Sequence, residues 1–319
     1  MSTIGTPLLW SLFTLFVIGS LLVDFLAMER QGAHKVTMRE AGLWSLVWVA
    51  VSAGFAIWLW WHLGGADGNA LAQTKTMEFV TGYLVEKALA VDNIFVFLMV
   101  FSYFAVPAEF QKRVLMWGIL GALVLRAAMI LLGAWLLVKF HWLLYVFGAF
   151  LLFTGIKMWL AAGHSPDLGD NPALKWLRRH IKVSPAFDGE RFFTQHQGQR
   201  MATPLLLVIL LIGIVDIVFA VDSIPAIFAI TTDPFIVLTS NVFAILGLRA
   251  MYFLLAGMQE RFHLLPYGLA LVLGLIGVKM LLIDVWKIPV AWSLAATVVI
   301  LAVTMVLSLK LPPRDKATA

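Results

Sequence analysis

Long apolar runs separated by short polar segments make up most of the chain. Each run is about 20 residues long, which is enough for a helix to cross the hydrocarbon core of a bilayer. A membrane β-barrel would instead show alternating segments of about ten residues, and the sequence has no such pattern. The pattern therefore predicts an all-α polytopic membrane protein. The nine expected spans are residues 7–27, 41–62, 77–101, 114–137, 141–161, 203–230, 235–257, 264–284 and 289–309.

One longer polar segment, residues 163–203, separates the fifth and sixth expected spans. Asn171 followed by Pro172 is a favourable helix start, with Asn as the N-cap and Pro in the first turn. Leucines then share one face while Lys and Arg lie elsewhere, so we expect a helix over 171–183 in the membrane interface, attracted to anionic lipid. A plain solvated connector is the alternative. Residues 191–203 contain a possible HQGQ turn and predict a small hairpin.

Lys and Arg are distributed unevenly over the connecting segments. Fifteen lie in the alternating set 28–40, 102–113, 162–202, 258–263 and 310–319, and three lie in the other set. Leaving out the long segment still gives nine against three. Because cytoplasmic loops carry the excess of basic residues, we expect the amino terminus outside and the carboxyl terminus in the cytoplasm. Topology thus accounts for the net charge of +5, and nucleic acid is not expected as a partner.

The composition supports a single transmembrane domain over 1–319 and argues against several other classes of protein. The chain is 61% hydrophobic and 13% charged, with a mean hydropathy of +0.93, whereas soluble proteins are about half apolar and about a quarter charged. There is no cysteine, so disulfides, iron–sulfur clusters and thiolate metal sites are excluded. No P-loop motif is present, which argues against an internal NTP motor. The first run contains Asp24 and lacks a basic start and a cleavage site, so we expect a retained span rather than a signal peptide.

Three short motifs occur twice in the same order. They share charged or polar landmarks, which makes chance similarity between apolar helices a poor explanation. The matched pairs are EKALAVDNI (86–94) with DIVFAVDSI (216–224), LRAAM (125–129) with LRAMY (248–252), and GIKM (155–158) with GVKM (277–280).

These matches relate the third to fifth spans to the sixth to eighth. The third span is expected to run inward and the sixth outward, so the two halves are predicted to be inverted repeats. The first repeat covers about 77–161 and the second about 203–284. Secondary transporters often have this arrangement, with the substrate site near mid-bilayer where the repeats meet.

Eight ionisable residues lie well inside the expected spans. At roughly 2.5–3.5 kcal/mol each on insertion scales, they would cost about 20 kcal/mol if they faced lipid. They must therefore face each other, water or a bound ion. Arg126 and Arg249 are placed to clamp a carboxylate from the neighbouring repeat, and Lys87 could neutralise a carboxylate when no ion is bound. The eight are Asp24, Glu86, Lys87, Asp92, Arg126, Asp216, Asp222 and Arg249.

The repeated motifs also supply a set of oxygen donors suited to a hard cation such as Mn²⁺, Mg²⁺ or Ca²⁺. All seven His fall in loops or at span ends, which argues against a zinc, copper or nickel pathway. Asp92 lies about 120° around a helix from Glu86. One ion could reach both only at a locally opened helix or in a wide cavity, so broken helices are expected here. The candidate metal ligands are Glu86, Asp92, Asn93, Asp216, Asp222 and Ser223.

At these residues the chain resembles the TerC family of integral membrane proteins, and within it the Alx-type members. The resemblance covers nearly the whole chain and implies a multi-pass protein of the bacterial inner membrane, with an inverted repeat and a link to Mn²⁺ export. It also implies that the four acidic residues of the two motifs line the ion path. The stretches that carry it are TGYLVEKALAVDNIFVFLMVFSYF (81–104), FAVDSIPAIFAITTDPFIVLTSN (219–241) and FAILGLRAMYFLLAG (243–257).

The second motif departs from the Alx-type pattern at two positions. That pattern has Glu three residues before the first Asp and Ser directly before it, where this chain has Gly213 and Val215. If the Glu binds metal or carries protons, its loss alters transport rate, metal choice or coupling.

The sequence as a whole predicts a secondary transporter that exports Mn²⁺ from the cytoplasm in exchange for protons. We expect no chemical catalysis and no cofactor. A Ca²⁺/H⁺ exchanger would use the same ligands, and a non-transporting membrane partner that helps translocated proteins to fold or acquire metal is a third hypothesis. Association with itself or with other membrane proteins is compatible with each of these.

Overall fold

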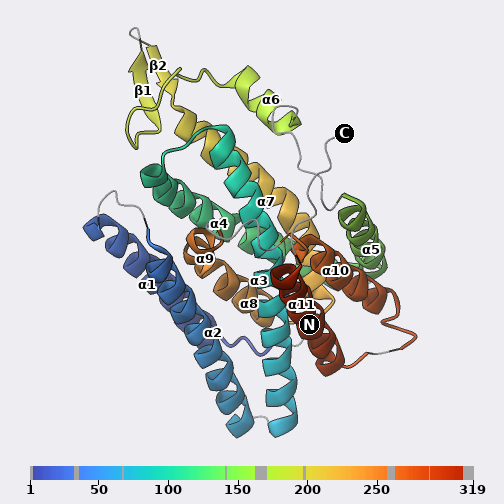
Figure 1. The fold of residues 1–319 in the computed structure, drawn as a ribbon. Coiled ribbons are helices and arrows are strands. Elements are labelled where there is room, and N and C mark those ends of the chain that lie inside the picture. Colours follow the sequence, from blue (N-terminus) through green and yellow to red (C-terminus); the bar gives the residue numbers. More distant parts are fainter. Residues whose placement is uncertain are drawn as a thin grey trace.

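The computed structural model describes residues 3–31, 36–66, 68–140, 142–161, 171–196, 199–256, 263–286 and 288–311. It confirms the all-helical fold class, with one small hairpin. Figure 1 shows α1 and α2 along one side of the molecule, α5, α10 and α11 along the other, and α6 with the hairpin at one end. The elements are α1 (Pro7–Gln31), α2 (Met38–Ala66), α3 (Asn69–Tyr103), α4 (Ala108–Lys139), α5 (Leu143–Ala161), α6 (Pro172–His180), β1 (Phe193–His196), β2 (Gln199–Ala202), α7 (Pro204–Phe228), α8 (Pro234–Leu246), α9 (Leu248–Ala256), α10 (Leu265–Leu281) and α11 (Val290–Lys310).

Helices occupy every expected span position, but fewer have the length and hydropathy of a membrane crossing. Within the described ranges six helices meet both requirements, and the bent pair α8–α9 adds a seventh if it forms one span. The helix α10 has 17 residues. The helix α3 has 35 residues and is continuous, but it carries the charged residues Glu78, Glu86, Lys87 and Asp92. The structure therefore supports six or seven crossings, and nine remains a prediction.

The centre of the bundle is α8, of which eleven of 13 residues are buried. Aromatic contacts attach it to the first two helices: the Phe235 ring lies 5.0 Å from that of Trp10, and the Phe243 ring lies 4.7 Å from that of Phe55. Large apolar side chains on α1, α2 and α11 are exposed. Because water-soluble proteins rarely expose large apolar faces, these outer faces suit lipid contact.

The helices α3 and α7 are continuous through both repeated motifs, so the expectation that these helices open locally there was wrong. Pro225 is accommodated close to the carboxyl end of α7, where its ring disturbs few hydrogen bonds. The break lies instead between α8 and α9, which are bent by 42° at Gly247. A Cβ on Gly247 would lie 2.6 Å from Nζ of Lys87 and 3.1 Å from Cβ of Trp48, so a side chain at the bend would displace the Lys87 ammonium and press on Trp48.

Small residues bring α5 and α10 into close contact. A Cβ on Gly148 would lie 3.1 Å from the carbonyl oxygen of Gly277, and a Cβ on Gly155 would lie 2.9 Å from that of Ala270. The residue numbers rise on α5 as they fall on α10, so the two helices cross in antiparallel directions.

The polar segment contains the predicted capped helix and the predicted hairpin. The Asn171 side chain accepts hydrogen bonds from the backbone of Ala173 at 2.9 Å and Leu174 at 3.3 Å. The helix α6 ends at His180, three residues before the predicted end, and buries Leu174 and Leu177. The strands β1 and β2 pair antiparallel, which confirms the hairpin.

Candidate functional site

The Arg126 guanidinium lies between carboxylates from two helices. Through Nη1 it pairs with Oε1 of Glu86 on α3. On its other side Nη2 donates to Oδ1 of Asp216 on α7 at 3.1 Å, and Nε donates to Oδ2 at 3.4 Å. Nη1 also donates to Oγ of Ser223 at 3.4 Å. One cation on α4 therefore holds an acid from each repeated motif.

Glycines allow the helices to approach closely enough for these contacts. A Cβ on Gly133 of α4 would lie 2.8 Å from the Phe228 ring of α7. On α3, a Cβ on Gly82 would lie 3.0 Å from Ile227 of α7 and 2.9 Å from Oγ of Ser240 on α8. Side chains on α3, α4 and α7 can therefore contact one another at the site.

The site is shielded from solvent. Glu86 is 1% exposed, Arg126 3% and Asp216 4%. The amide of Asn93, oriented to satisfy its neighbours, accepts from Nη2 of Arg126 at 3.2 Å and donates to the Leu89 carbonyl at 3.1 Å. Two buried carboxylates thus share one guanidinium, and if all three are ionised the group carries one net negative charge. Such a site attracts a further cation.

Asp92 and Asp222 belong to α3 and α7, but their side chains lie outside the described residues. Among the side chains that are described, no three acidic or histidine groups converge as a metal centre would require. The two described acids are instead bound by Arg126. The side chains assembled here offer carboxylate, amide and hydroxyl oxygens. These are the ligands that hard divalent cations prefer.

Lys87, next to Glu86 in sequence, makes a different contact from the carboxylate pairing considered above. Its Nζ donates to the carbonyl oxygen of Ala244 at 3.0 Å and lies 5.9 Å from the centre of the Tyr83 ring. In an unbroken helix the Ala244 carbonyl would accept from the backbone of Leu248. The Lys87 ammonium therefore replaces a helical hydrogen bond at the α8–α9 bend.

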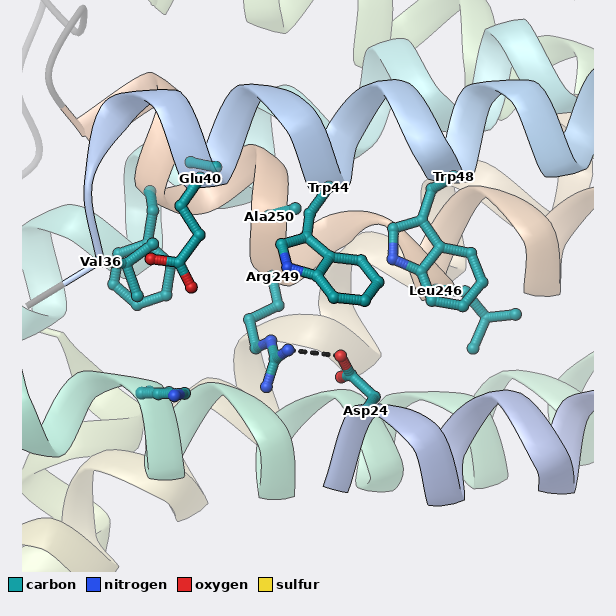
Figure 2. A pocket seen from close by; sticks show the side chains of 11 residues that line it. Asp24, Val36, Glu40, Trp44, Trp48, Leu246, Arg249 and Ala250 are labelled. Carbon is teal, nitrogen blue, oxygen red and sulfur yellow. Dashed lines mark hydrogen bonds and ion pairs between the residues drawn. The ribbon is translucent and has the colours of Figure 1, made fainter. Parts of the chain in front are cut away.

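Arg249 matches Arg126 in the repeated LRA motif but does not pair with Glu86 or Asp216 in the structure. It forms an ion pair with Asp24 on α1, which precedes both repeats, rather than with a carboxylate of the neighbouring repeat. Figure 2 shows this pair facing Glu40, Trp44 and Trp48 across a small pocket. Matching the two proposed repeats could not predict Asp24 as the partner of Arg249, because α1 lies outside both.

Two further polar features were not predicted. At the amino-terminal end of α3, Glu78 accepts from Thr231 at 2.6 Å and pairs with Lys75 at 2.9 Å, and Lys75 lies 3.5 Å from Asp233. The second feature is Asn241, a buried amide in the apolar helix α8. An Asn inside an apolar run is a signal that the sequence does offer.

The fold and site define a multi-pass membrane protein with an ion-paired acidic centre. Comparison with known proteins is more specific: the chain belongs to the integral membrane protein TerC family, whose model matches residues 71–316. It is 55% identical over 308 residues to the "Putative membrane-bound redox modulator Alx" of Escherichia coli K12, which covers 97% of this chain and 96% of that protein. A Shigella flexneri protein of the same name has the same identity and coverage.

A third relative, the "Uncharacterized membrane protein STKORF319" of Myxococcus xanthus, is 48% identical over 307 residues, or 96% of this chain and 93% of that one. No solved structure matched the chain. These relatives confirm the Alx-type assignment and a multi-pass location in a bacterial membrane.

Proposed function

We propose that this protein is a secondary transporter that exports Mn²⁺ from the cytoplasm in exchange for protons. One observation carries the proposal: Arg126 joins Glu86 and Asp216, which occupy the same position of two repeated motifs. A buried site built from equivalent residues of two repeats is typical of substrate sites in secondary transporters. Intramembrane ionisable residues are in general signs of an ion pathway.

The helix contacts support the inverted repeat that this proposal requires. The first repeat is α3, α4 and α5, and the second is α7, α8–α9 and α10. The contacts of α3 with α8 are matched by those of α7 with α4. Between α5 and α10, exchanging each residue for its repeat counterpart converts the Gly148–Gly277 contact into the Ala270–Gly155 contact, and both are observed. Their antiparallel crossing is the direction that a two-fold axis in the membrane plane produces.

Export of a divalent cation needs a source of energy. Two positive charges moving outward against about 100 mV, inside negative, cost roughly 4.6 kcal/mol. Carboxylates that bind metal in one access state and protons in the other would couple this step to proton entry. We propose that Glu86, Asp92, Asp216 and Asp222 have this role, and that rocking of one repeat against the other alternates access.

Arg126 gives this exchange a physical basis. In the structure its guanidinium provides the positive charge beside Glu86 and Asp216. An incoming Mn²⁺ ion would replace that charge with a double one, and the guanidinium would move aside or share the site. Arg126 thus keeps the acids compensated between transport events, since an unpaired buried charge is strongly unfavourable.

A second candidate is a non-transporting membrane partner, favoured by the redox-modulator name of the relatives and by the polar α6 and hairpin as a docking element. Since the chain has no cysteine, a thiol-based role would depend on its partner. Ca²⁺/H⁺ exchange remains the third, because oxygen ligands alone do not separate Mn²⁺ from Ca²⁺.

Metal flux in proteoliposomes distinguishes these candidates. Purified protein is reconstituted, and Mn²⁺, Ca²⁺ and Mg²⁺ movement is recorded with and without a pH gradient. The proposal predicts Mn²⁺ flux that a pH gradient accelerates and that Asp92→Asn and Asp222→Asn each abolish. Absence of flux for every metal would favour the partner role, and faster Ca²⁺ than Mn²⁺ flux would favour the exchanger.

A further inference from the structure

The helix α8 carries a buried amide without a hydrogen-bond partner in the described part of the chain. Asn241 is 1% exposed, and neither its Oδ1 nor its Nδ2 is bonded. The preceding residues differ, because Thr239 and Ser240 donate to backbone carbonyls of their own helix, each at 2.7 Å. Buried polar groups are nearly always satisfied, so an exception in the centre of a membrane protein calls for an explanation.

The direction of the Asn241 side chain follows from the contacts of its neighbours. Phe235 and Phe243 face the rings of α1 and α2, and Ser240 faces Gly82 of α3. At 100° per residue, Asn241 lies about 160° from Phe243 and about 100° beyond Ser240. It therefore points away from α1 and α2 into the bundle. Besides α3, the helix packed most extensively against α8 is α4, which carries Arg126.

The depth of Asn241 is fixed by the pairing of α8 with α3. Lys75 lies near Asp233, Gly82 against Ser240, and Lys87 against Ala244, so the two helices run side by side in parallel. Glu86 follows Gly82 by one turn, and Asn241 follows Ser240 by one residue. At 1.5 Å per residue the two side chains start within about one turn, roughly 5 Å, of the same level.

We propose that Asn241 is a ligand of the transported cation, contributing its amide oxygen from α8 beside the carboxylates of α3 and α7. This inference rests on the proposed function. An amide oxygen is a hard, neutral donor suited to Mn²⁺ or Ca²⁺. It adds one ligand to the ion without adding negative charge. The ion is therefore held less tightly than by a further carboxylate and can be released. In the first repeat the matching position is Gly118, so the second repeat alone supplies this donor.

Two near-isosteric substitutions test the assignment on the full-length protein in detergent, with thermal unfolding measured with and without Mn²⁺. Asn241→Leu removes the oxygen. Without metal, we expect the thermal midpoint of this variant to equal or exceed that of the wild type. With Mn²⁺, we expect the stabilising shift to be lost, which corresponds to at least a tenfold weaker affinity for the ion. Asn241→Asp keeps an oxygen donor and should keep the Mn²⁺ shift. Ser240→Ala is the matched control, because its hydroxyl bonds within α8, and should leave the shift unchanged.

If Asn241 had only a structural role, the buried charge of Asn241→Asp would lower the thermal midpoint more than Asn241→Leu does. Asn241→Leu would then show the same Mn²⁺-induced shift as the wild type. That result, obtained while the wild type responds to Mn²⁺, would overturn the ligand assignment and leave the proposed function standing. If Asn241→Leu does not fold, Asn241→Ala takes its place with the same expectations. A wild type with neither a shift nor flux for Mn²⁺, Ca²⁺ or Mg²⁺ would overturn both proposals.

Discussion

Arg126 is the residue on which the candidate site depends. It compensates Glu86 and Asp216 at once, and all three are buried. In a low-dielectric interior, removing one partner of such a group is far more damaging than replacing the whole group by apolar side chains. While they are ionised, the two acids therefore need a compensating cation. Either the guanidinium or a transported ion can be that cation.

Removing the Arg126 charge tests this idea. Arg126→Gln leaves two buried carboxylates uncompensated, and we expect unfolding to become easier by about 3–5 kcal/mol without metal. Mn²⁺ should then stabilise the variant more than it stabilises the wild type, because the ion supplies the missing charge. Thermal unfolding in detergent measures both effects. Arg249→Gln breaks an ion pair with Asp24 that involves neither Glu86 nor Asp216, so it is the control and should show no extra metal rescue. Equal rescue in both variants would contradict the assignment.

Gly213 permits a second test at a single position. A Cβ there meets no atom within 4 Å, so α7 has room for a longer side chain one turn before Asp216. Restoring the acid of the Alx-type pattern with Gly213→Glu should raise the Mn²⁺ flux. Gly213→Gln has the same size without the charge and should leave flux near the wild-type value. If Gln raises flux as much as Glu, helix propensity rather than the carboxylate is responsible.

At the scale of the elements, the bend between α8 and α9 distinguishes the two proposed repeats. The matching segment of the first repeat lies inside the continuous helix α4. At the bend, the Lys87 ammonium donates a hydrogen bond to the Ala244 carbonyl in place of a helical backbone donor, and Gly247 lies between the two helices. The bend also places Arg249 next to Asp24 on α1, while Arg126 remains with the acids. The two matched arginines thus have different partners, and one lies in a continuous helix while the other follows a bend.

Adding one methyl group tests whether the bend needs glycine. In Gly247→Ala the new Cβ would displace Lys87 and press on Trp48, so we expect a loss of about 1–3 kcal/mol in the free energy of unfolding. Gly121→Ala on α4 is the matched control, because its Cβ meets nothing within 4 Å. That change should stabilise the helix by about 0.5–1 kcal/mol. Equal effects on the thermal midpoint would show that the contact with Lys87 is unimportant.

The sequence predicted the helical segments, the α6 cap and the hairpin because these features are local. Apolar run length, an Asn–Pro pair and a turn signal are each sufficient for their own element. The α8–α9 bend was not predicted, since LGLRAMY differs from the continuous LVLRAAM at the bend only by Gly247 in place of Val124, and a glycine in an apolar helix does not by itself mark a bend. At the site, the repeated acids and arginines were visible as charges in apolar runs, and the predicted pairing of Arg126 with an acid of the other motif is observed with Asp216. The pairing of Arg249 with Asp24 depends on helix packing that no pattern encodes.

At the scale of the whole molecule, the central question is how the two repeats lie in the membrane. The positive-inside rule predicts that the connection after α4 lies outside and that the polar segment with α6 lies inside. Both connections offer exposed cationic positions, Lys139 and Arg179. The absence of cysteine makes the chain suitable for single-cysteine labelling without prior substitutions.

Labelling of intact cells tests this orientation. A membrane-impermeant maleimide should modify Lys139→Cys from outside and should modify Arg179→Cys after permeabilisation alone. The reverse pattern would invert the proposed direction of both repeats, and labelling of both from outside would contradict the predicted number of crossings between them. The unsubstituted chain, which lacks cysteine, serves as the blank.

The most direct test of the central claim is Mn²⁺ flux through proteoliposomes carrying a Glu86→Gln, Asp216→Asn double variant. This change removes both charges that Arg126 compensates while keeping side-chain size, and the fold is checked by the thermal midpoint. The proposal predicts pH-gradient-driven Mn²⁺ flux in the wild type and at least a tenfold lower rate in a folded double variant. Wild-type flux in the folded variant would contradict the claim that the acids of the two motifs form the ion path.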